Sequence, residues 1–200
     1  MRIVPWMQPL FHDRAAAGRV LAEVVPQAEL VVGVARGGVA VAAEVARALE
    51  VPLTAVDVER VDDFGRRLGA ATANGPPYLL VPEAEVEGVL ARARLEAERL
   101  EARLEHARLP VEGRDALVVD DGAITGLTLA AACVWAGAAG ATRVVAAVPV
   151  AHVEGLRRLA EAADEVVCPH PLEEIAVVGQ AYDSFDPLDE WYVASLLAER

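Results

Sequence analysis

Hydrophobic positions along the chain form short apolar runs, rich in valine, that alternate with segments of helical periodicity. Such runs, bounded by turn residues, are typical of buried strands. Strands are predicted at residues 29–35, 53–58, 115–120, 142–150 and 165–168. Because strands that alternate with helices pair in parallel through right-handed crossovers, the pattern predicts an α/β fold with a doubly wound parallel sheet.

Helical periodicity fills most of the intervals between these runs. Asp13 is a candidate N-cap for the first helix, because its carboxylate can accept hydrogen bonds from free amides of the first turn. Helices are expected at residues 13–25, 39–50, 83–108, 128–138 and 153–162, and from about Leu188 onward.

Residues 59–82 break this alternation, because they are rich in glycine, proline and charged residues. We expect a long loop or an irregular hairpin there. The helix at 83–108 would be roughly 39 Å long. An apolar stripe with steps of three and four follows its length, and we expect it to pack on the core or on a partner subunit. The stripe consists of Val86, Leu90, Ala93, Ala97, Leu100 and Leu104.

Composition narrows the classes of function. The chain has 200 residues, 54% of them hydrophobic, which suits one domain with a single core. Eighteen basic against 31 acidic residues give a net charge of −13, so we expect no nucleic-acid partner and no anionic membrane partner. All of the basic residues are arginine, which excludes a lysine nucleophile.

Two cysteines, Cys133 and Cys168, are too few for a disulfide framework and are expected in the core. The first residues do not have the pattern of a signal peptide, and no apolar run is long enough to span a membrane. We therefore expect a cytoplasmic protein.

The clearest candidate chemistry lies in residues 117–128, LVVDDGAITGLT. Asp120 and Asp121 end a buried strand, where two carboxylates without a partner would be costly. Carboxylates are suited to accept hydrogen bonds from the vicinal hydroxyls of a sugar. Ligands of open parallel sheets bind beyond the carboxyl ends of the strands, which is where this pair falls.

The residues after the acid pair predict a phosphate site. At the start of a helix, free amides and the helix dipole favour an anion, and Gly126 permits its close approach. The hydroxyls of Thr125 and Thr128 add donors, and ribose 5-phosphate has both a diol and a phosphate. The segment lacks the lysine of a P-loop and does not fit G-x-G-x-x-G. The five residues are Ile124, Thr125, Gly126, Leu127 and Thr128.

VVDDGAITGLT resembles the motif of type I phosphoribosyltransferases that binds 5-phosphoribosyl pyrophosphate (PRPP). The resemblance implies that Asp120 and Asp121 hold the ribose 2′- and 3′-hydroxyls, and that residues 124–128 hold the 5-phosphate. ARGG at residues 35–38 is similar to the family's pyrophosphate loop, whose backbone amides, often around a cis peptide, bind the diphosphate. Its members are Ala35, Arg36, Gly37 and Gly38, of which Arg36 would add a charged donor.

The resemblance extends over nearly the whole chain and is closest to a bacterial subgroup of the family. Members of that subgroup begin with an Asp-Arg-x-x-Ala-Gly-type helix, as in HDRAAAGRVLAE, and end with a segment like AVVGQAYDSF. The fold implied is one domain over residues 1–200. Its core is a five-stranded parallel sheet over about 29–168, with a small hood from about 1–25 and 169–200.

Two departures from the family pattern bear on activity. Where the family has a basic pair that helps bind pyrophosphate, this chain has Glu59 and Arg60, and only Arg60 keeps the charge. Asp62 and Asp63 would repel a diphosphate unless Mg²⁺ intervenes. Ile124 stands where purine-salvage members have an acidic residue, and an isoleucine cannot exchange a proton. This argues against a hypoxanthine–guanine reaction.

The resemblance implies an Mg²⁺-dependent phosphoribosyltransferase that moves the phosphoribosyl group of PRPP to an unidentified nitrogenous base and releases pyrophosphate. Arg60, Asp120 and Asp121 would be its catalytic residues, and the two aspartates would hold the metal, directly or through water. The departures keep a second hypothesis open, a non-catalytic regulatory module that binds PRPP or a nucleotide. The family's habit of pairing and the apolar stripe favour a homodimer, without settling the oligomeric state.

Aromatic residues of the tail have two interpretations. Tyr182, Phe185, Trp191 and Tyr192 are either hood residues that stack on a base or side chains that pack the tail.

Overall fold

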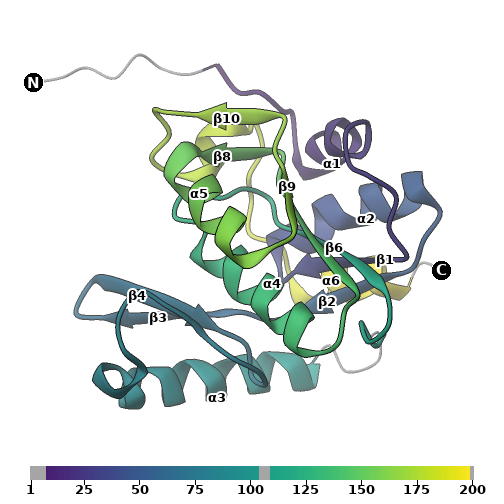
Figure 1. Ribbon diagram of the computed structural model, residues 1–200. Coiled ribbons are helices and arrows are strands. Elements are labelled where there is room, and N and C mark those ends of the chain that lie inside the picture. The colour runs from purple at the N-terminus through teal and green to yellow at the C-terminus, as the bar shows by residue number, and fades with distance from the viewer. Residues whose placement is uncertain (1–7, 104–108, 199–200) are drawn as a thin grey trace, which may run out of the picture.

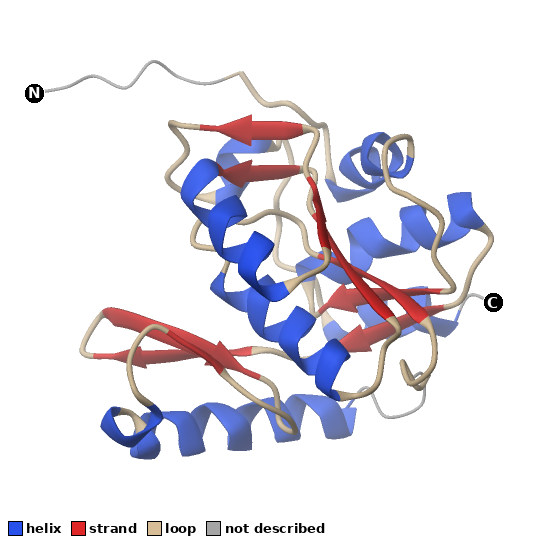
Figure 2. Ribbon diagram, in the orientation of Figure 1, coloured by secondary structure: helices blue, strands red, loops and turns tan. Residues whose placement is uncertain are grey.

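A five-stranded parallel sheet forms the centre of the computed structural model, which describes residues 8–103 and 109–198 (Figures 1 and 2). The strand order is β2-β1-β6-β7-β9, and β1 pairs in parallel with both β2 and β6. The predicted fold class is confirmed. The strands are β1 (Leu30–Val34), β2 (Leu53–Val56), β6 (Asp115–Val119), β7 (Arg143–Ala147) and β9 (Glu165–Val167).

Helices cover both faces of the sheet (Figure 1). Alternate strand residues point to opposite faces. Val31 therefore packs in a cluster with α2, while Val32 packs in the cluster that contains α4. One face carries α1 (Arg14–Ala22), α2 (Gly37–Leu49) and α6 (Glu190–Ala198), and the other carries α4 (Leu127–Ala138) and α5 (Val153–Ala162). The carboxylate of Asp13 caps α1 by accepting from the Ala16 amide at 2.7 Å, as predicted.

Residues 59–79 form a separate antiparallel sheet, where we expected a long loop or an irregular hairpin. Its strands are β3 (Glu59–Asp63), β4 (Arg66–Ala71) and β5 (Tyr78–Leu79). The hairpin is the form observed, and it is irregular because the register shifts between Val61 and Asp62.

Helix α3 (Glu87–Arg103) lies along this hairpin and begins later than predicted (Figure 1). Residues Glu83–Glu85 form a 3₁₀ turn, η1, which is common at helix N-termini. The predicted stripe is buried at Val86, Leu90, Ala93 and Ala97, and the first three pack against Val61 and other hairpin residues. The stripe is thus used within the chain. Leu104 and the predicted end of the helix lie outside the described residues.

The predicted strand at 142–150 divides into two. β7 ends at Ala147, and after Pro149, which has no amide hydrogen for a ladder, β8 (Val150–His152) pairs in parallel with β10 (His170–Leu172). Beside this pair, Phe11 bridges to Tyr182, next to the 3₁₀ turn η3 (Val178–Ala181). Residues from both ends of the chain therefore meet in one unit, at the top of Figure 1.

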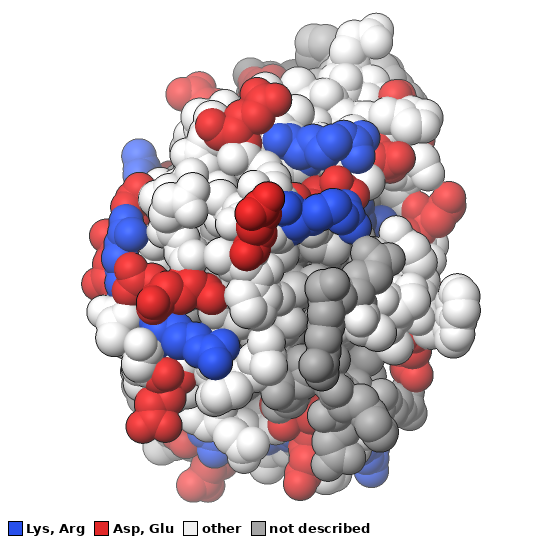
Figure 3. Space-filling view, turned by 90° about the vertical axis from the view of Figure 1, so that its right-hand side faces the viewer, with Lys and Arg blue, Asp and Glu red and all other residues white. Residues whose placement is uncertain are grey.

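The surface and the helices agree with the absence of long apolar or basic tracts in the sequence. Figure 3 shows charged side chains of both signs interspersed on the face that it presents. Among the described residues, no helix has both the length and the apolar character needed to cross a membrane.

Candidate functional site

The loops that follow β1 and β6 are in contact. Because these strands are parallel neighbours, both loops leave the same edge of the sheet. A Cβ atom on Gly37 would lie 2.0 Å from Asp121 Oδ2. A Cβ atom on Gly38 would lie 2.7 Å from the carbonyl oxygen of Val119 and 3.0 Å from Asp120 Oδ1. Only glycine at these two positions allows the first loop to lie directly against the acid pair.

Asp121 is held by side chains from both ends of the chain. Arg14 Nε donates to Asp121 Oδ2 at 2.8 Å, and the Tyr182 hydroxyl donates to the Asp121 carbonyl oxygen at 2.6 Å. The side chains of Arg14 and Asp121 are only 11% and 14% exposed. Asp121 therefore forms a largely buried ion pair.

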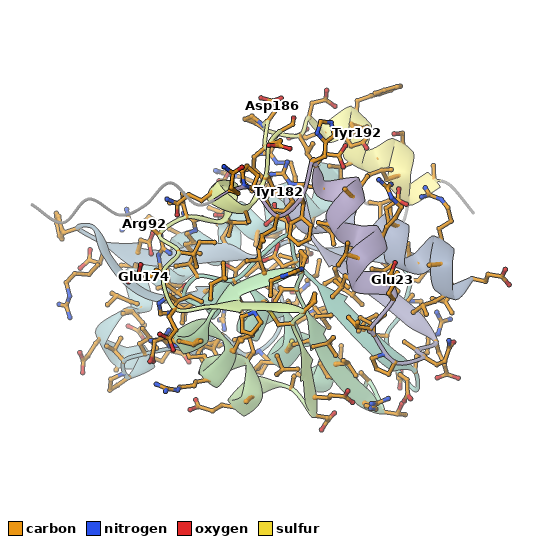
Figure 4. The ribbon with its side chains drawn as sticks, turned by 90° about the horizontal axis from the view of Figure 1, so that it is seen from above. Glu23, Arg92, Glu174, Tyr182, Asp186 and Tyr192 are labelled. Atoms are coloured by element: carbon orange, nitrogen blue, oxygen red, sulfur yellow. The ribbon has the colours of Figure 1, made fainter. Side chains whose placement is uncertain are left out.

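Arg14 is itself fixed by the tail. Its Nη1 donates to the Asp186 carbonyl oxygen at 2.9 Å, and its guanidinium carbon lies 3.8 Å from the centre of the Phe185 ring. Phe185 in turn stacks at a tilt on Tyr182, with ring centres 4.9 Å apart. Figure 4 labels Tyr182 and Asp186, which come from the tail between η3 and α6. The guanidinium is thereby locked in one orientation.

Asp120 is in a different environment. Its Oδ1 accepts from the Asp121 amide at 2.8 Å, and among the described residues the structure gives it no ion pair. Burial raises the pKa of Asp120 well above its usual range, and the negative charge of Asp121 raises it further. The charges of Arg14 and Arg60 oppose this rise. Burial also raises the pKa of Asp121, where the hydrogen bond and charge of Arg14 act in the opposite direction.

The loop before α4 is fixed from behind by α5. Gly126 has a φ of +75°, and a Cβ there would lie 2.6 Å from the Gly155 carbonyl oxygen. Arg158 Nη1 donates to the Thr125 carbonyl oxygen at 2.8 Å. The Thr125 carbonyl therefore points toward α5. The first amides of α4, like those of any helix, have no partner within the helix and can bind a ligand. Within residues 8–103 and 109–198, no side-chain hydrogen bond caps that N-terminus.

The side chains of residues 124–128 divide between packing and exposure. Leu127 is buried in the main core, so only its backbone can serve a ligand. Ile124 packs against the cluster that contains Phe11 and Tyr182. Thr125 and Thr128 are partly exposed, and within the described part of the chain their hydroxyls have no recorded hydrogen bond. Their hydroxyls are therefore available as donors.

The loop at residues 35–38 contains a cis peptide bond between Ala35 and Arg36, as the family resemblance led us to expect. Arg36 precedes the first residue of α2 and makes no recorded ion pair with the described residues. Its charge slightly lowers the pKa of Glu59 at the start of β3, against the larger effect of burial.

Strand β3 carries Arg60, whose charge lowers the pKa of Asp120 against the larger effect of burial. Glu59 is half-buried, and burial together with the charge of Glu96 raises its pKa. Asp62 and Asp63, expected to repel a diphosphate, are paired across the hairpin with Arg67 and Arg66. Arg67 Nε lies 4.0 Å from Asp62 Oδ1, so part of the repulsion is neutralised locally.

Sequence reasoning did not single out Arg14 or Arg158. The Asp-Arg-x-x-Ala-Gly-type helix could have indicated Arg14, because this helix is part of the family resemblance that also identified the two loops. Tyr182 and Phe185 were left between two interpretations, and the structure places both against the acid-pair loop or its partner Arg14. No pattern in the sequence pointed to Arg158.

Comparisons with known proteins cover the residues of this candidate site. A family model for the phosphoribosyl transferase domain matches residues 13–184. Two curated proteins of Mycobacterium tuberculosis, each named "Putative phosphoribosyl transferase", are 37% identical to this chain over 205 residues. The match covers 94% of this chain and 46% of each relative. The chain thus spans about half the length of the curated relatives it matches.

Solved structures with a similar fold include TT1426 from Thermus thermophilus. It has a TM-score of 0.81 and 35% identity, and the match covers 94% of this chain and 98% of that chain. APRTase from Giardia lamblia complexed with 9-deazaadenine has a TM-score of 0.51 and 14% identity, over 80% of each chain. At that identity the second likeness concerns the fold alone.

Proposed function

Because the chain belongs to the phosphoribosyl transferase domain family, we propose that it transfers the phosphoribosyl group of PRPP to a nitrogenous base and releases pyrophosphate. The contact between the two loops carries this proposal. Gly37 and Gly38 lie against Asp121 and Asp120, which puts a candidate diphosphate loop beside a candidate sugar site. In PRPP the diphosphate is on C1, next to the carbon that bears the 2′-hydroxyl. Binding of PRPP therefore needs the diphosphate loop and the sugar site side by side.

Each part of the ligand has a chemically suitable partner. A carboxylate of the acid pair accepts hydrogen bonds from the ribose hydroxyls. The amides at the start of α4, with the hydroxyls of Thr125 and Thr128, bind the 5-phosphate. The backbone of residues 35–38 and the Arg36 guanidinium bind the diphosphate.

The chain contributes mainly position and charge to the chemistry. Displacement at the sugar C1 passes through a state with positive charge on the ring, which a neighbouring carboxylate stabilises. Holding the sugar and the acceptor in line supplies much of the remaining rate enhancement. Arg36 and Arg60 stabilise the negative charge that accumulates on the departing diphosphate. We assign Arg60 and Asp120 as the catalytic residues on this basis, with Asp121 beside them as the second acid of the pair.

The acid pair also fits Mg²⁺. This ion prefers oxygen ligands and is commonly held by one or two carboxylates together with substrate phosphates and water. Burial and mutual repulsion disfavour two ionised carboxylates in this position, so a cation there would be stabilising. No group of three or more acidic, histidine or cysteine side chains suited to a metal occurs among the described residues, so PRPP and water would complete the shell. When bound, Mg²⁺ neutralises charge on the diphosphate.

The acceptor does not depend on proton exchange with residue 124. Ile124 is partly buried in an apolar cluster and has no titratable group. The acceptor is therefore a base that is nucleophilic without help at this position.

The test is release of pyrophosphate from PRPP and Mg²⁺ in the presence of a panel of nitrogenous bases. Asp120→Asn together with Asp121→Asn should abolish PRPP binding. Asp115→Asn is the matched control, because Asp115 lies at the opposite end of β6, where it accepts from the Thr142 hydroxyl. A wild-type protein that binds no phosphoribosyl compound would refute the proposal.

A second function is favoured by the hairpin. Glu59 occupies a position expected to be basic, and the charges of Arg60 and Arg36 only partly offset the rise in the pKa of its half-buried carboxyl group. A site weakened in this way suits a module that binds PRPP or a nucleotide and regulates a partner. Calorimetric binding of PRPP without turnover would support this alternative. Arg60→Ala discriminates the two, because it should chiefly lower turnover in an enzyme.

A further inference from the structure

The two aspartates of the acid pair have unequal partners. One oxygen of Asp121 faces the Arg14 guanidinium at 2.8 Å, and that guanidinium is also bonded to the Asp186 carbonyl and stacked on Phe185. Asp120 receives only the amide of its neighbour and no recorded cation from the described residues. Among the described residues, each carboxylate keeps at least one oxygen without a recorded side-chain donor, but only Asp121 is held in an ion pair.

Asp121 also contacts three separate parts of the chain. Its Oδ2 lies 2.0 Å from the position that a Cβ on Gly37 would take, and its carbonyl oxygen accepts from the Tyr182 hydroxyl. Through these contacts it connects the first loop, helix α1 and the tail. If the Asp121 carboxylate turned toward a ligand, it would leave the buried guanidinium of Arg14 without its acidic partner, which is costly.

We propose that the two acids divide their roles: Arg14 commits Asp121 to the protein, and Asp120 is the carboxylate that contacts the ribose hydroxyls. Arg14 is a positioning residue that acts through Asp121 and does not touch the ligand. This inference rests on the proposed function for the identity of the ligand. It departs from the family resemblance, which assigns both acids to the sugar.

The experiment measures affinity and stability separately. Ribose 5-phosphate, which lacks the diphosphate, is the calorimetric probe, and the unfolding midpoint is measured without ligand. Asp120→Asn should weaken ribose 5-phosphate binding about tenfold to hundredfold, which corresponds to one charge-assisted hydrogen bond, without lowering the midpoint. Asp121→Asn and Arg14→Gln should lower the midpoint and change affinity by less than about threefold.

Two further variants test the Arg14–Asp121 link itself. Arg14→Gln combined with Asp121→Asn should lower the midpoint no more than the worse single variant, because both remove the same interaction. Arg14→Lys keeps the charge and should recover part of the midpoint and the wild-type affinity. If Asp121→Asn does not fold, Tyr182→Phe replaces it, because it removes only the hydroxyl that donates to the Asp121 carbonyl.

Each result separates the alternatives. A loss of affinity in Asp121→Asn or Tyr182→Phe as large as that in Asp120→Asn would overturn the division of roles, as would an unchanged affinity in Asp120→Asn. Additive midpoints in the double variant would overturn the Arg14–Asp121 link. Failure of the wild type to bind both ribose 5-phosphate and PRPP would refute the proposed function instead, and the additivity of the midpoints would still be measured.

Discussion

Replacing Gly37 with alanine tests how closely the two loops must approach. The new Cβ would lie 2.0 Å from Asp121 Oδ2 and 3.2 Å from Arg14 Nε. Non-bonded carbon and oxygen atoms normally stay at least about 3.3 Å apart. The carboxylate must therefore move by more than an ångström, which is enough to break its hydrogen bond with Arg14.

The expected loss of stability combines two opposing effects. Breaking a charge-assisted hydrogen bond costs about 1.5–3 kcal/mol. Replacing glycine at a position with ordinary backbone angles returns about 0.4–1 kcal/mol through the unfolded chain. The net destabilisation is about 1–2 kcal/mol, or roughly 2–8 °C in the thermal midpoint of a chain of this size. Affinity for PRPP should also fall, because the first loop is displaced.

The change in the free energy of unfolding is measured by urea unfolding of Gly37→Ala, with Gly88→Ala as the control. Gly88 is exposed in α3, and a Cβ added there would have no atom within 4 Å, so alanine should stabilise the protein by about 0.5–1 kcal/mol. If Gly37→Ala were as stable as the wild type, or shifted in the same direction as Gly88→Ala, the close contact between the loops would be wrong.

Three further outcomes follow from the same structure. Gly126→Ala should destabilise by about 1–2 kcal/mol in urea unfolding, because its φ of +75° and the Gly155 carbonyl 2.6 Å from a Cβ both disfavour a side chain. Asp120→Asn should be more stable than the wild type at neutral pH. The raised pKa of Asp120 means that the folded wild type loses stability as pH rises from about 4 through that pKa, and the asparagine variant does not. Unfolding followed across pH would show a difference that grows with pH; a constant difference would contradict this. Finally, burial raises the pKa of Cys133 to about 12, so a thiol reagent at pH 8 should modify it only after unfolding, and rapid modification of the native protein would be inconsistent.

The central sheet was predictable because its inner strands β1, β6 and β7 are buried on both faces. The strand β1, LVVGV, has no polar side chain and is therefore not mistaken for a loop. Asp13 is a helix cap that can be identified from the local sequence. The strands β3 and β4 carry no such signal, since ERVDD and RRLGAA are half polar and rely on α3 to cover them. Their pairing was therefore visible only as a candidate hairpin.

The candidate site was predictable where residues are neighbours in sequence, and not where they are distant. The adjacent aspartates and the small residues after them indicate a candidate ligand-binding turn from local chemistry alone. The hydrogen bond from Arg14 to Asp121 joins residues 107 positions apart, and nothing in the local pattern of either segment specifies the other. The unequal environments of Asp120 and Asp121 depend on that contact, so they appear only in three dimensions.

The bonds of Arg14 also have a consequence for biosynthesis. Its two hydrogen bonds close chain segments of 107 and 172 residues, and contacts that close such long segments form late in folding. During translation, the first helix emerges while the segment around Tyr182 and Asp186 has yet to be synthesised. A nascent polypeptide can therefore assemble the sheet strand by strand before the contacts that hold Asp121 have formed. Chains that terminate before this segment would lack the Tyr182 and Asp186 contacts that hold Asp121 and Arg14 in place.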